Sequence, residues 1–345
     1  MRYDRQPMFG TLLGPLPRPQ PAIDHTGDGG GGRDRVRSVD DLVREAIRAQ
    51  EQAGLEPITD GGLRLADPFD VVSPNDAGES AVDDWRFAAG CTEVMVKQAL
   101  PGPYTLGRRL ADGGVADGRD AASDRNAASN HAARVVNGRI HDLIDAGCPY
   151  IEIHEPDATL IGEDPAERRR FKAAQAVLVE GVHGAHLSLV ITGGNADAAG
   201  PETILVDGYQ SLAVDLIAGP DNWRLIARAT ESWGIVCGAL RTTEGSDDGP
   251  ELLVWATRYA ASTGGRGLVR VGLGTAGGLA ALSWTAALTK MERLGRAAYI
   301  AGLPPGDELA SSLDPRALDL KSRAFGRRVP RRTLSLTDRP AKEDE

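Results

Sequence analysis

The sequence has 345 residues, 41% of them hydrophobic, which suffices for one large core, and its formal net charge of −10 disfavours nucleic acid as a partner, because phosphate binding needs a basic face. Its three cysteines form no CxxC motif and are too few for a disulfide framework, so we expect a reducing, cytoplasmic location. We find no secretion signal and no run near the roughly 18 apolar residues of a membrane helix, so we expect no membrane partner.

Eight short apolar runs, most of them ending in glycine, proline or polar residues, recur along the chain. Most are separated by stretches with apolar residues at three- and four-residue spacing, such as Val39 to Ile47 and Trp223 to Ala227. This alternation predicts a parallel α/β sheet, and eight units are enough to close it into a (β/α)8 TIM barrel. The predicted strands are Thr11–Gly14, Leu55–Asp60, Val94–Gln98, Tyr150–Glu155, Leu187–Thr192, Val214–Ala218, Ile235–Leu240 and Leu268–Leu273.

Three segments interrupt this pattern. Residues 28–37 contain four consecutive glycines among charges, which predicts a flexible loop after the first strand. The long connection after the third strand has two glycine breaks and then a helical stretch near residues 123–146, which predicts a lid, a helical hairpin or a plain surface excursion. We assign residues 1–310 to the barrel and 311–345 to a disordered tail, whose arginines leave docking on an acidic surface and self-association open.

The strongest chemical signal follows the fourth predicted strand. In such barrels the chemistry lies at the C-terminal ends of the strands. The strand Tyr150–Glu155 ends in His154 and Glu155, Asp157 follows, and Pro156 stops the strand because it has no N–H to donate. Three titratable groups at a barrel mouth suit proton transfer, amine binding or metal ligation, while a structural His–Glu pair is the alternative.

Further candidates follow other predicted strands. Asp60 and Arg64 flank a glycine pair, which suits close approach to a ligand but also a plain turn with a surface ion pair. Lys97 meets an anion or acid if it is buried, and otherwise faces outward. Tyr104 stacks on a planar ligand or packs in the core. Asp215 lies within a predicted strand, so its carboxylate needs a partner or a ligand.

The other histidines and cysteines near the predicted strands do not lie at the C-terminal end of a strand. His183 and His186 precede the fifth predicted strand, on the face of the barrel that only stabilises. Cys91 and Cys148 also precede strands, and Cys237 lies within one. We therefore expect structural roles for all five side chains.

Taken together, these runs resemble the C-terminal catalytic barrel of cobalamin-independent methionine synthase, especially its short forms, and more distantly uroporphyrinogen decarboxylase. The similarity spans roughly residues 10–299 and rests on the order and spacing of motifs along successive strands. It implies a TIM barrel with an activity like methyl transfer from methyltetrahydrofolate to homocysteine. The matching segments are Gly14–Arg18, Gln50–Gly61 with Arg64, Lys97–Thr105, Ile151–Pro156 and Asp215–Asn222.

The zinc ligands of that family do not match. The family holds zinc through a His-x-Cys pair after the fifth strand, an acid after the sixth and a cysteine after the eighth. The resemblance places these ligands at Ile191–Asn195, at Asp215 and at Gly274–Ala276, where at most one ligand remains. Since a lone carboxylate gives little affinity for zinc, we expect the usual zinc site to be absent.

The family's carboxylates around the substrate amine differ as well. Gly62 stands where the family has an acid after the second strand, and His154 stands where it has an aspartate before the glutamate. Only Glu155 remains, and each lost charge-assisted hydrogen bond is typically worth about 1.5–3 kcal/mol. Methionine synthesis by the usual mechanism is therefore not expected.

The polar set that remains suits acid–base chemistry. We predict that His154 is a general acid or base poised by Glu155, with Asp60 as a further catalytic group. Arg64 or Lys97 is expected to receive an anionic group of the substrate. Substrate-binding roles are predicted for Arg64, Lys97, Tyr104, Asp157, Asn195 and Asp215, and no metal ligand is predicted.

Three functions stay open from the sequence. The first is a diverged methionine synthase-like enzyme that transfers a methyl or other one-carbon unit to a small molecule without the usual zinc, from a folate or corrinoid donor. The second is a metal-free lyase or decarboxylase, and the third is a non-catalytic ligand-binding barrel. Another divalent ion held by His154, Glu155 and Asp215 is compatible with the first two. The expected partner is a small, anionic molecule, and the oligomeric state is open.

Overall fold

The structure is a computed structural model that describes residues 8–18, 38–64, 79–113, 121–246, 249–306, 308–309 and 312–313. The predicted loop over residues 28–37 and nearly all of the predicted tail over residues 311–345 lie outside these ranges. Within the described ranges, no helix combines the length and the apolar character needed to cross a membrane.

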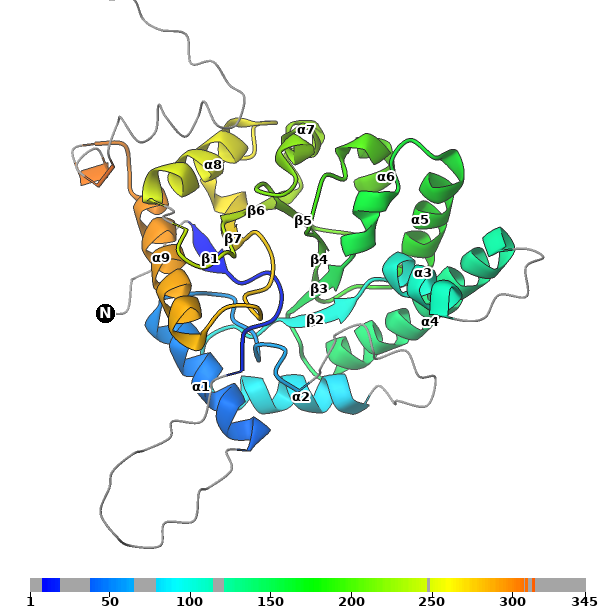
Figure 1. The fold of residues 1–345 in the computed structure, drawn as a ribbon, viewed down its shortest axis with the longest axis horizontal. Coiled ribbons are helices and arrows are strands. Elements are labelled where there is room, and N and C mark those ends of the chain that lie inside the picture. Colours follow the sequence, from blue (N-terminus) through cyan, green and yellow to red (C-terminus); the bar gives the residue numbers. More distant parts are fainter. Residues whose placement is uncertain are drawn as a thin grey trace, which may run out of the picture.

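Seven parallel strands curl into a TIM-barrel-like sheet with the order β1-β7-β6-β5-β4-β3-β2 (Figure 1). This confirms the predicted fold class. The strands are β1 (Phe9–Thr11), β2 (Gln98–Pro101), β3 (Tyr150–His154), β4 (His186–Ile191), β5 (Ser211–Asp215), β6 (Gly234–Leu240) and β7 (Val271–Thr275).

Residues 55–60, predicted as the second strand, lie between β1 and β2. The Glu56 N–H donates to the Gly10 carbonyl at 2.9 Å, and Ile58 forms an isolated parallel bridge to the chain before β2. Pro57 has no N–H, so it cannot donate to a regular ladder at this position. The segment therefore occupies the eighth position of the barrel with a bridge in place of a full strand.

The predicted strand bounds are wrong by several residues at four places. One is the run placed at Val214–Ala218, since β5 spans Ser211–Asp215. The first run was placed at Thr11–Gly14, but β1 ends at Thr11, and Gly14 has a φ of 103° that an extended strand does not adopt. The run before β2 was placed at Val94–Gln98, whereas only Gln98 belongs to that strand. The last run begins as a 3-10 turn, η4 (Leu268–Arg270), in which apolar Val269 is 76% exposed.

Helices cover the outside of the sheet (Figure 1). They are α1 (Val39–Gln52), α2 (Glu79–Ala89), α3 (Pro103–Gly113), α4 (Ala121–Asp145), α5 (Pro165–Leu178), α6 (Pro201–Ile204), α7 (Trp223–Arg228), α8 (Pro250–Ser262) and α9 (Trp284–Gly302). In the long connection after β2, α3 packs against α4, which is the helical pair that the sequence left as one of its alternatives.

Local signals explain where several helices begin. Ser38 caps α1, because its side chain accepts from the Asp41 N–H while the Asp41 carboxylate accepts from the Ser38 N–H. At α5, the Asp164 side chain accepts from the Ala166 N–H and Pro165 takes the first helical position. These contacts satisfy backbone N–H groups that the first turn of a helix leaves without partners.

A large apolar core lies between the sheet and the helices, and a second, smaller cluster fills the barrel interior. Gly272 on β7 makes room for this interior cluster, since a Cβ there would lie 2.3 Å from the Phe9 ring. The interior cluster consists of Leu13, Val190, Ala213 and Val236, with Phe9 packed against it.

The start of β4 is held by a polar contact inside the barrel. His186 Nε2 lies 2.7 Å from Ser211 Oγ, and its ring stacks on Tyr150 with centroids 4.5 Å apart. Burial lowers the pKa of His186, which favours the neutral ring in this setting. Of the three free thiols, those of Cys148 and Cys237 are buried.

Candidate functional site

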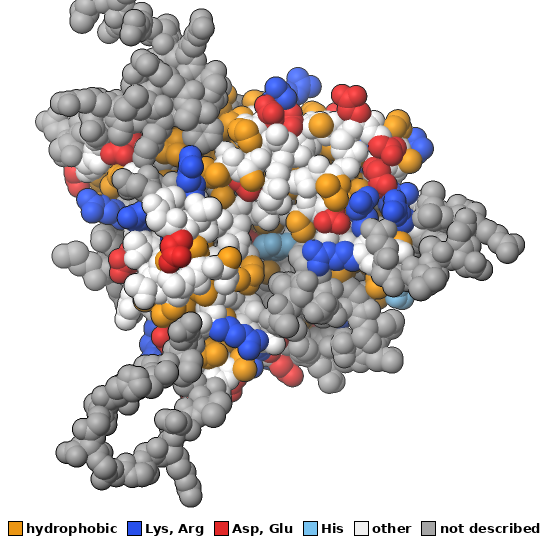
Figure 2. All heavy atoms as spheres, in the orientation of Figure 1, with side chains coloured by type: hydrophobic (Ala, Val, Ile, Leu, Met, Phe, Trp, Pro, Cys, Tyr) orange, Lys and Arg blue, Asp and Glu red, His pale blue; other side chains and the backbone are white. Residues whose placement is uncertain are grey.

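A cavity of about 320 Å³ opens at the C-terminal edge of the first half of the barrel. In Figure 2, a histidine side chain and nearby lysine or arginine side chains reach the surface near the centre of the face toward the viewer. The cavity is lined by Leu12, Leu13, Gly14, Pro15, Thr59, Asp60, Gly62, Arg64, Asp84, Lys97, Gln98, Ala99, Leu100, Pro101, Arg109, Glu152, His154, Pro156, Thr192 and Gly278. Thus four of the predicted site residues, Asp60, Arg64, Lys97 and His154, come together in one cavity.

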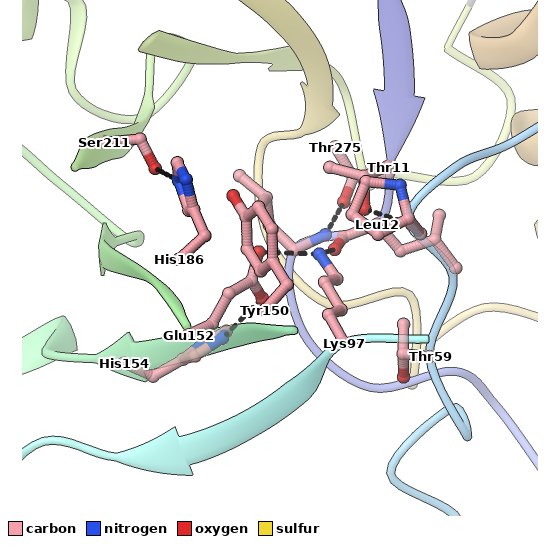
Figure 3. A network of polar contacts seen from close by, with 12 residues as sticks. Thr11, Leu12, Thr59, Lys97, Tyr150, Glu152, His154, His186, Ser211 and Thr275 are labelled. Carbon is pink, nitrogen blue, oxygen red and sulfur yellow. Dashed lines mark hydrogen bonds and ion pairs between the residues drawn. The ribbon is translucent and has the colours of Figure 1, made fainter. Parts of the chain in front are cut away.

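A buried ion pair forms the floor of this cavity. Lys97 Nζ lies 2.6 Å from Glu152 Oε1 and donates to the Leu12 carbonyl, also at 2.6 Å (Figure 3). Both side chains are 1% exposed. Burial lowers the pKa of Lys97, while the Glu152 carboxylate opposes that shift. Burial alone would raise the pKa of Glu152, but the Lys97 ammonium and the His154 ring outweigh it and hold that pKa below its ordinary value.

The His154 ring connects this ion pair to the cavity. Its Nε2 lies 3.1 Å from Glu152 Oε2, the oxygen that Lys97 does not contact (Figure 3). With Nε2–H donating to the carboxylate, Nδ1 is left as the acceptor nitrogen of a neutral ring. His154 is partly exposed, at 15%, so substrate can reach it. The three side chains form a relay from a fixed cation through a carboxylate to an imidazole.

This pairing corrects the predicted contact between His154 and Glu155. Successive side chains of a strand point to opposite faces, so Glu152 and His154 share the face toward the barrel interior. That alternation is the signal that identifies Glu152, which the sequence analysis missed. Glu155 follows the end of β3, and its carboxylate is fully buried on the side of α3.

Glu155 holds the start of α3. Its carboxylate accepts the backbone N–H groups of Tyr104 at 2.9 Å and Thr105 at 2.8 Å. The Thr105 hydroxyl and the Gln175 amide also donate to it, at 2.7 and 2.6 Å. Burial outweighs these donors and raises the pKa of Glu155 to about 7. Gly102 leaves the space, because a Cβ there would lie 2.1 Å from the Glu155 carboxyl carbon.

Asp60 lies at the edge of the cavity after residues 55–59. Its Oδ1 accepts from the Gly62 N–H at 2.9 Å and lies 3.3 Å from the Thr59 hydroxyl. Burial raises the pKa of Asp60, although these donors and the charge of Arg64 oppose the shift. Asp60 is therefore a second titratable group that substrate can meet.

Arg64 lines the cavity, but its guanidinium already pairs with two carboxylates. It contacts Asp40 Oδ1 at 2.6 Å and Asp84 Oδ1 at 3.0 Å, and it lies over the Phe87 ring. Arg109, which the sequence analysis did not single out, also lines the cavity and lies on α3. No local pattern marks Arg109, since only the packing of α3 brings it to the mouth.

Tyr104 and Asp157 are among the predicted substrate-binding residues that do not line the cavity. The buried Tyr104 hydroxyl donates to Glu167 Oε2 at 2.7 Å, and its ring packs edge-on against Phe171. Asp157 Oδ2 lies 3.4 Å from Arg108 Nε. Both side chains are thus engaged in packing around α3.

Asp215 and Asn195 lie on the other side of the mouth and also outside the cavity lining. The buried Asp215 carboxylate accepts three backbone N–H groups, from Gly193 at 3.1 Å, Ile217 at 2.7 Å and Ala218 at 2.9 Å. Asn195 accepts from the Asp221 N–H at 2.9 Å. These contacts fold the loops after β4 and β5.

The residues at the family's zinc positions do not fit a zinc ion. Residues 191–195 and 274–276 supply no sulfur, imidazole or carboxylate, and Asp215 is occupied by backbone donors. In the described ranges, no three histidine, cysteine, aspartate or glutamate side chains group as metal ligands would.

Solved structures with this fold include two proteins classed with the methionine synthases. A B12-independent methionine synthase from Shewanella sp. W3-18-1, in complex with selenomethionine, has 18% identity and a TM-score of 0.65, covering 85% of this chain and 97% of its own. A Listeria monocytogenes protein provisionally classed as a vitamin B12-independent methionine synthase has 16% identity and a TM-score of 0.62, covering 86% and 98%.

A methyltransferase from Methanosarcina mazei is also similar, with 14% identity and a TM-score of 0.52 over 75% of this chain and 84% of that one. No protein-family model and no curated protein matches the chain. At these identities the likeness shows the fold, so the resemblance inferred from the sequence is confirmed at that level.

Proposed function

We propose that the protein is a small-molecule group-transfer enzyme, which moves a methyl or other one-carbon unit without the zinc site of the methionine synthases. The observation that carries this proposal is the Lys97–Glu152–His154 relay at the floor of an accessible cavity. Its fold neighbours include two methyl-transfer enzymes by name, which supports the same reaction class.

In this proposal His154 does the work that zinc does elsewhere, which is to make the acceptor nucleophilic. Nδ1 takes the proton from the acceptor's thiol, amine or similar group, while Glu152 stabilises the imidazolium that forms. The new bond joins the acceptor atom to the transferred carbon. The bond between that carbon and the donor breaks, and its electron pair stays on the donor. A folate nitrogen then takes up a proton, whereas with methylcobalamin the proton on His154 passes to water.

Lys97 keeps Glu152 ionised and fixes the carboxylate in place. Its ammonium is anchored on the Leu12 carbonyl, so the relay is held by β3, by the residue after β1 and by the residue before β2. A fixed carboxylate that accepts the Nε2–H selects the tautomer of the neutral imidazole in which Nδ1 can take a proton. Lys97 is thus a positioning residue rather than the group that receives the substrate.

The cavity lining supports a small acceptor with an apolar body and an anionic group. Its volume lies at the lower end of the range usual for small-molecule sites. Leucine, proline and alanine side chains form much of the wall. Arg64 and Arg109 both line the cavity and supply positive charge for an anion of the substrate, and Asp60 faces an amine or hydroxyl group.

The test is a methyl-transfer assay with purified protein, using methyltetrahydrofolate or methylcobalamin as donor and a panel of anionic thiols and amines as acceptors. Mass spectrometry detects the methylated acceptor. We expect a methylated acceptor with wild-type protein, and at least about a 100-fold slower reaction with His154→Gln. No product from any pair, or equal rates in His154→Gln, contradicts the proposal. Carbon dioxide release from the acceptors without methylation identifies a decarboxylase instead.

A further inference from the structure

A second concave site lies outside the barrel mouth, in a groove between α4 and α5. Its volume is about 290 Å³, and none of its lining residues lines the mouth cavity. On α5 the lining residues recur at helical spacing, so they form one face, and the alanines among them leave room beside the arginines. The groove is lined by Asn126, Asn130, Ala166, Arg169, Arg170 and Ala173.

One arginine of the groove is rigidly held before any ligand arrives. Arg170 is 4% exposed, its Nε donates to Asn126 Oδ1 at 2.8 Å, and its NH1 lies 2.6 Å from Glu167 Oε1. A guanidinium fixed in this way loses little freedom when an anion binds. The Asn126 side chain is oriented by the same contact.

Several arginines lie in or beside the groove. Glu167 is shared by three arginines, with Arg170 at 2.6 Å, Arg108 at 3.7 Å and Arg125 at 4.0 Å. Arg169 adds a fourth cation, is exposed on the groove wall, and makes no ion pair or hydrogen bond with the described part of the chain. Among the residues that the structure describes, Asp157 is a further carboxylate of this network, at 3.4 Å from Arg108.

This local charge runs against the chain as a whole, whose net charge is −10. An acidic protein that gathers arginines around one groove has a positive site within a negative field, so anions that reach it are held there and repelled elsewhere. Planar guanidinium groups present paired donors that match carboxylate and phosphate oxygens. The asparagine amides supply neutral donors beside them.

We infer that the α4–α5 groove binds a small polyanion, a molecule with clustered phosphate or carboxylate oxygens, through Arg169 and Arg170 with Asn130. The site is independent of the proposed chemistry at the mouth. The same donors can bind phosphate or carboxylate oxygens. Inorganic pyrophosphate and citrate are the two probes that distinguish these ligands.

The experiment is isothermal titration of the full-length protein with each probe at constant ionic strength. We expect saturable binding of one molecule per chain for at least one probe. Arg169→Gln and, separately, Asn130→Asp should weaken this binding by about tenfold or more, since each removes or repels a charge-assisted contact. Neither substitution touches a buried side chain, so both variants should keep the thermal midpoint of the wild type.

Two matched controls make the test specific. Lys172→Gln removes the same charge from an exposed position of α5 that does not line the groove, and it should change the affinity by less than about twofold. Arg109→Gln removes a cation from the mouth cavity and should leave binding intact.

Absence of saturable binding for both probes overturns the inference. An equal loss in Arg169→Gln and Lys172→Gln overturns it too, because it would mean attraction to general charge. Loss in Arg109→Gln with retention in Arg169→Gln would place the anion in the mouth instead.

Discussion

The two sides of the barrel mouth use their polar side chains in opposite ways. On the side of β1, β2 and β3, Lys97, Glu152 and His154 form a relay that ends at a cavity. On the side of β4 and β5, Asp215 and Asn195 bond to the backbone of the loops that follow these two strands. The first side can act on a ligand, whereas these two side chains of the second side hold its loops.

Glu152 and Glu155, which lie three positions apart in and after β3, show the same contrast. Glu152 faces the barrel interior and supports an imidazole that substrate can reach. Glu155 turns to the outside and caps the first backbone N–H groups of α3. A carboxylate that accepts several backbone N–H groups holds structure, and one that accepts from other ionisable side chains can take part in proton transfer. The predictions below test this distinction.

The largest effect on stability is expected from Lys97→Met, which leaves the Glu152 carboxylate buried without its cation. Removing one partner of a buried ion pair costs about 3–5 kcal/mol. Urea unfolding followed by circular dichroism measures it. The double variant Lys97→Met with Glu152→Leu removes both charges and should cost less than the single variant. A double variant that is less stable than the single would show that the ion pair is not the source of the loss.

Glu155→Ala should come next, at about 2–4 kcal/mol, because the first N–H groups of α3 lose their acceptor. The penalty should depend on pH in a defined direction. The pKa of Glu155 is raised to about 7 by burial, so the folded protein binds a proton that the unfolded chain releases above about pH 4.5. Glu155 therefore stabilises the fold fully at a pH below its pKa in the unfolded chain. This stabilisation is lost as the pH rises through its pKa in the folded protein.

The free energy of unfolding, measured by urea titration from about pH 4.5 to 8, checks this sign. The difference between the wild type and Glu155→Ala should shrink as the pH rises. A difference that grows with pH would mean that the carboxylate, and not the carboxylic acid, is the favoured form in the fold.

Tyr104→Phe is expected to cost about 1 kcal/mol through loss of the hydrogen bond to Glu167, and to leave the transfer rate unchanged. Tyr104 was predicted to bind substrate. A substrate-binding role would lower the transfer rate in this variant, whereas a structural role lowers only its stability. A rate that falls while the thermal midpoint stays constant would restore the substrate-binding role.

Asn195→Ala should have the smallest effect, below about 1 kcal/mol, because it removes contacts of one partly exposed loop. Differential scanning calorimetry gives the shift in the midpoint. A large loss of transfer activity in this variant would mean that the second side of the mouth does reach the substrate.

Much of the fold followed from the sequence, because strand-length apolar runs alternate with helical spacing along most of the chain. Strand bounds were predicted wrongly where apolar residues do not belong to a strand. Val269, for example, is apolar but lies exposed in a 3-10 turn. The closing segment near Pro57 was predicted as a strand, although a residue without an N–H limits its ladder.

The site was predicted less completely, for physical reasons. His154, Lys97, Asp60 and Arg64 were found because reactive side chains at strand ends meet at one edge of a barrel. Glu152 was missed because His154 was expected to contact Glu155, its neighbour along the chain. In a strand, residues two positions apart share a face, so His154 contacts Glu152 instead. Arg109 comes from a helix, and its approach to the mouth depends on tertiary packing that no local pattern specifies.

The central claim is that Glu152, and not Glu155, supports the reactive imidazole. The most direct measurement is the transfer rate of Glu152→Gln beside that of Glu155→Gln, each divided by its folded fraction. The account predicts a loss of at least about 100-fold for Glu152→Gln and a rate near that of the wild type for Glu155→Gln. A loss confined to Glu155→Gln, or an equal loss in both variants, would contradict it.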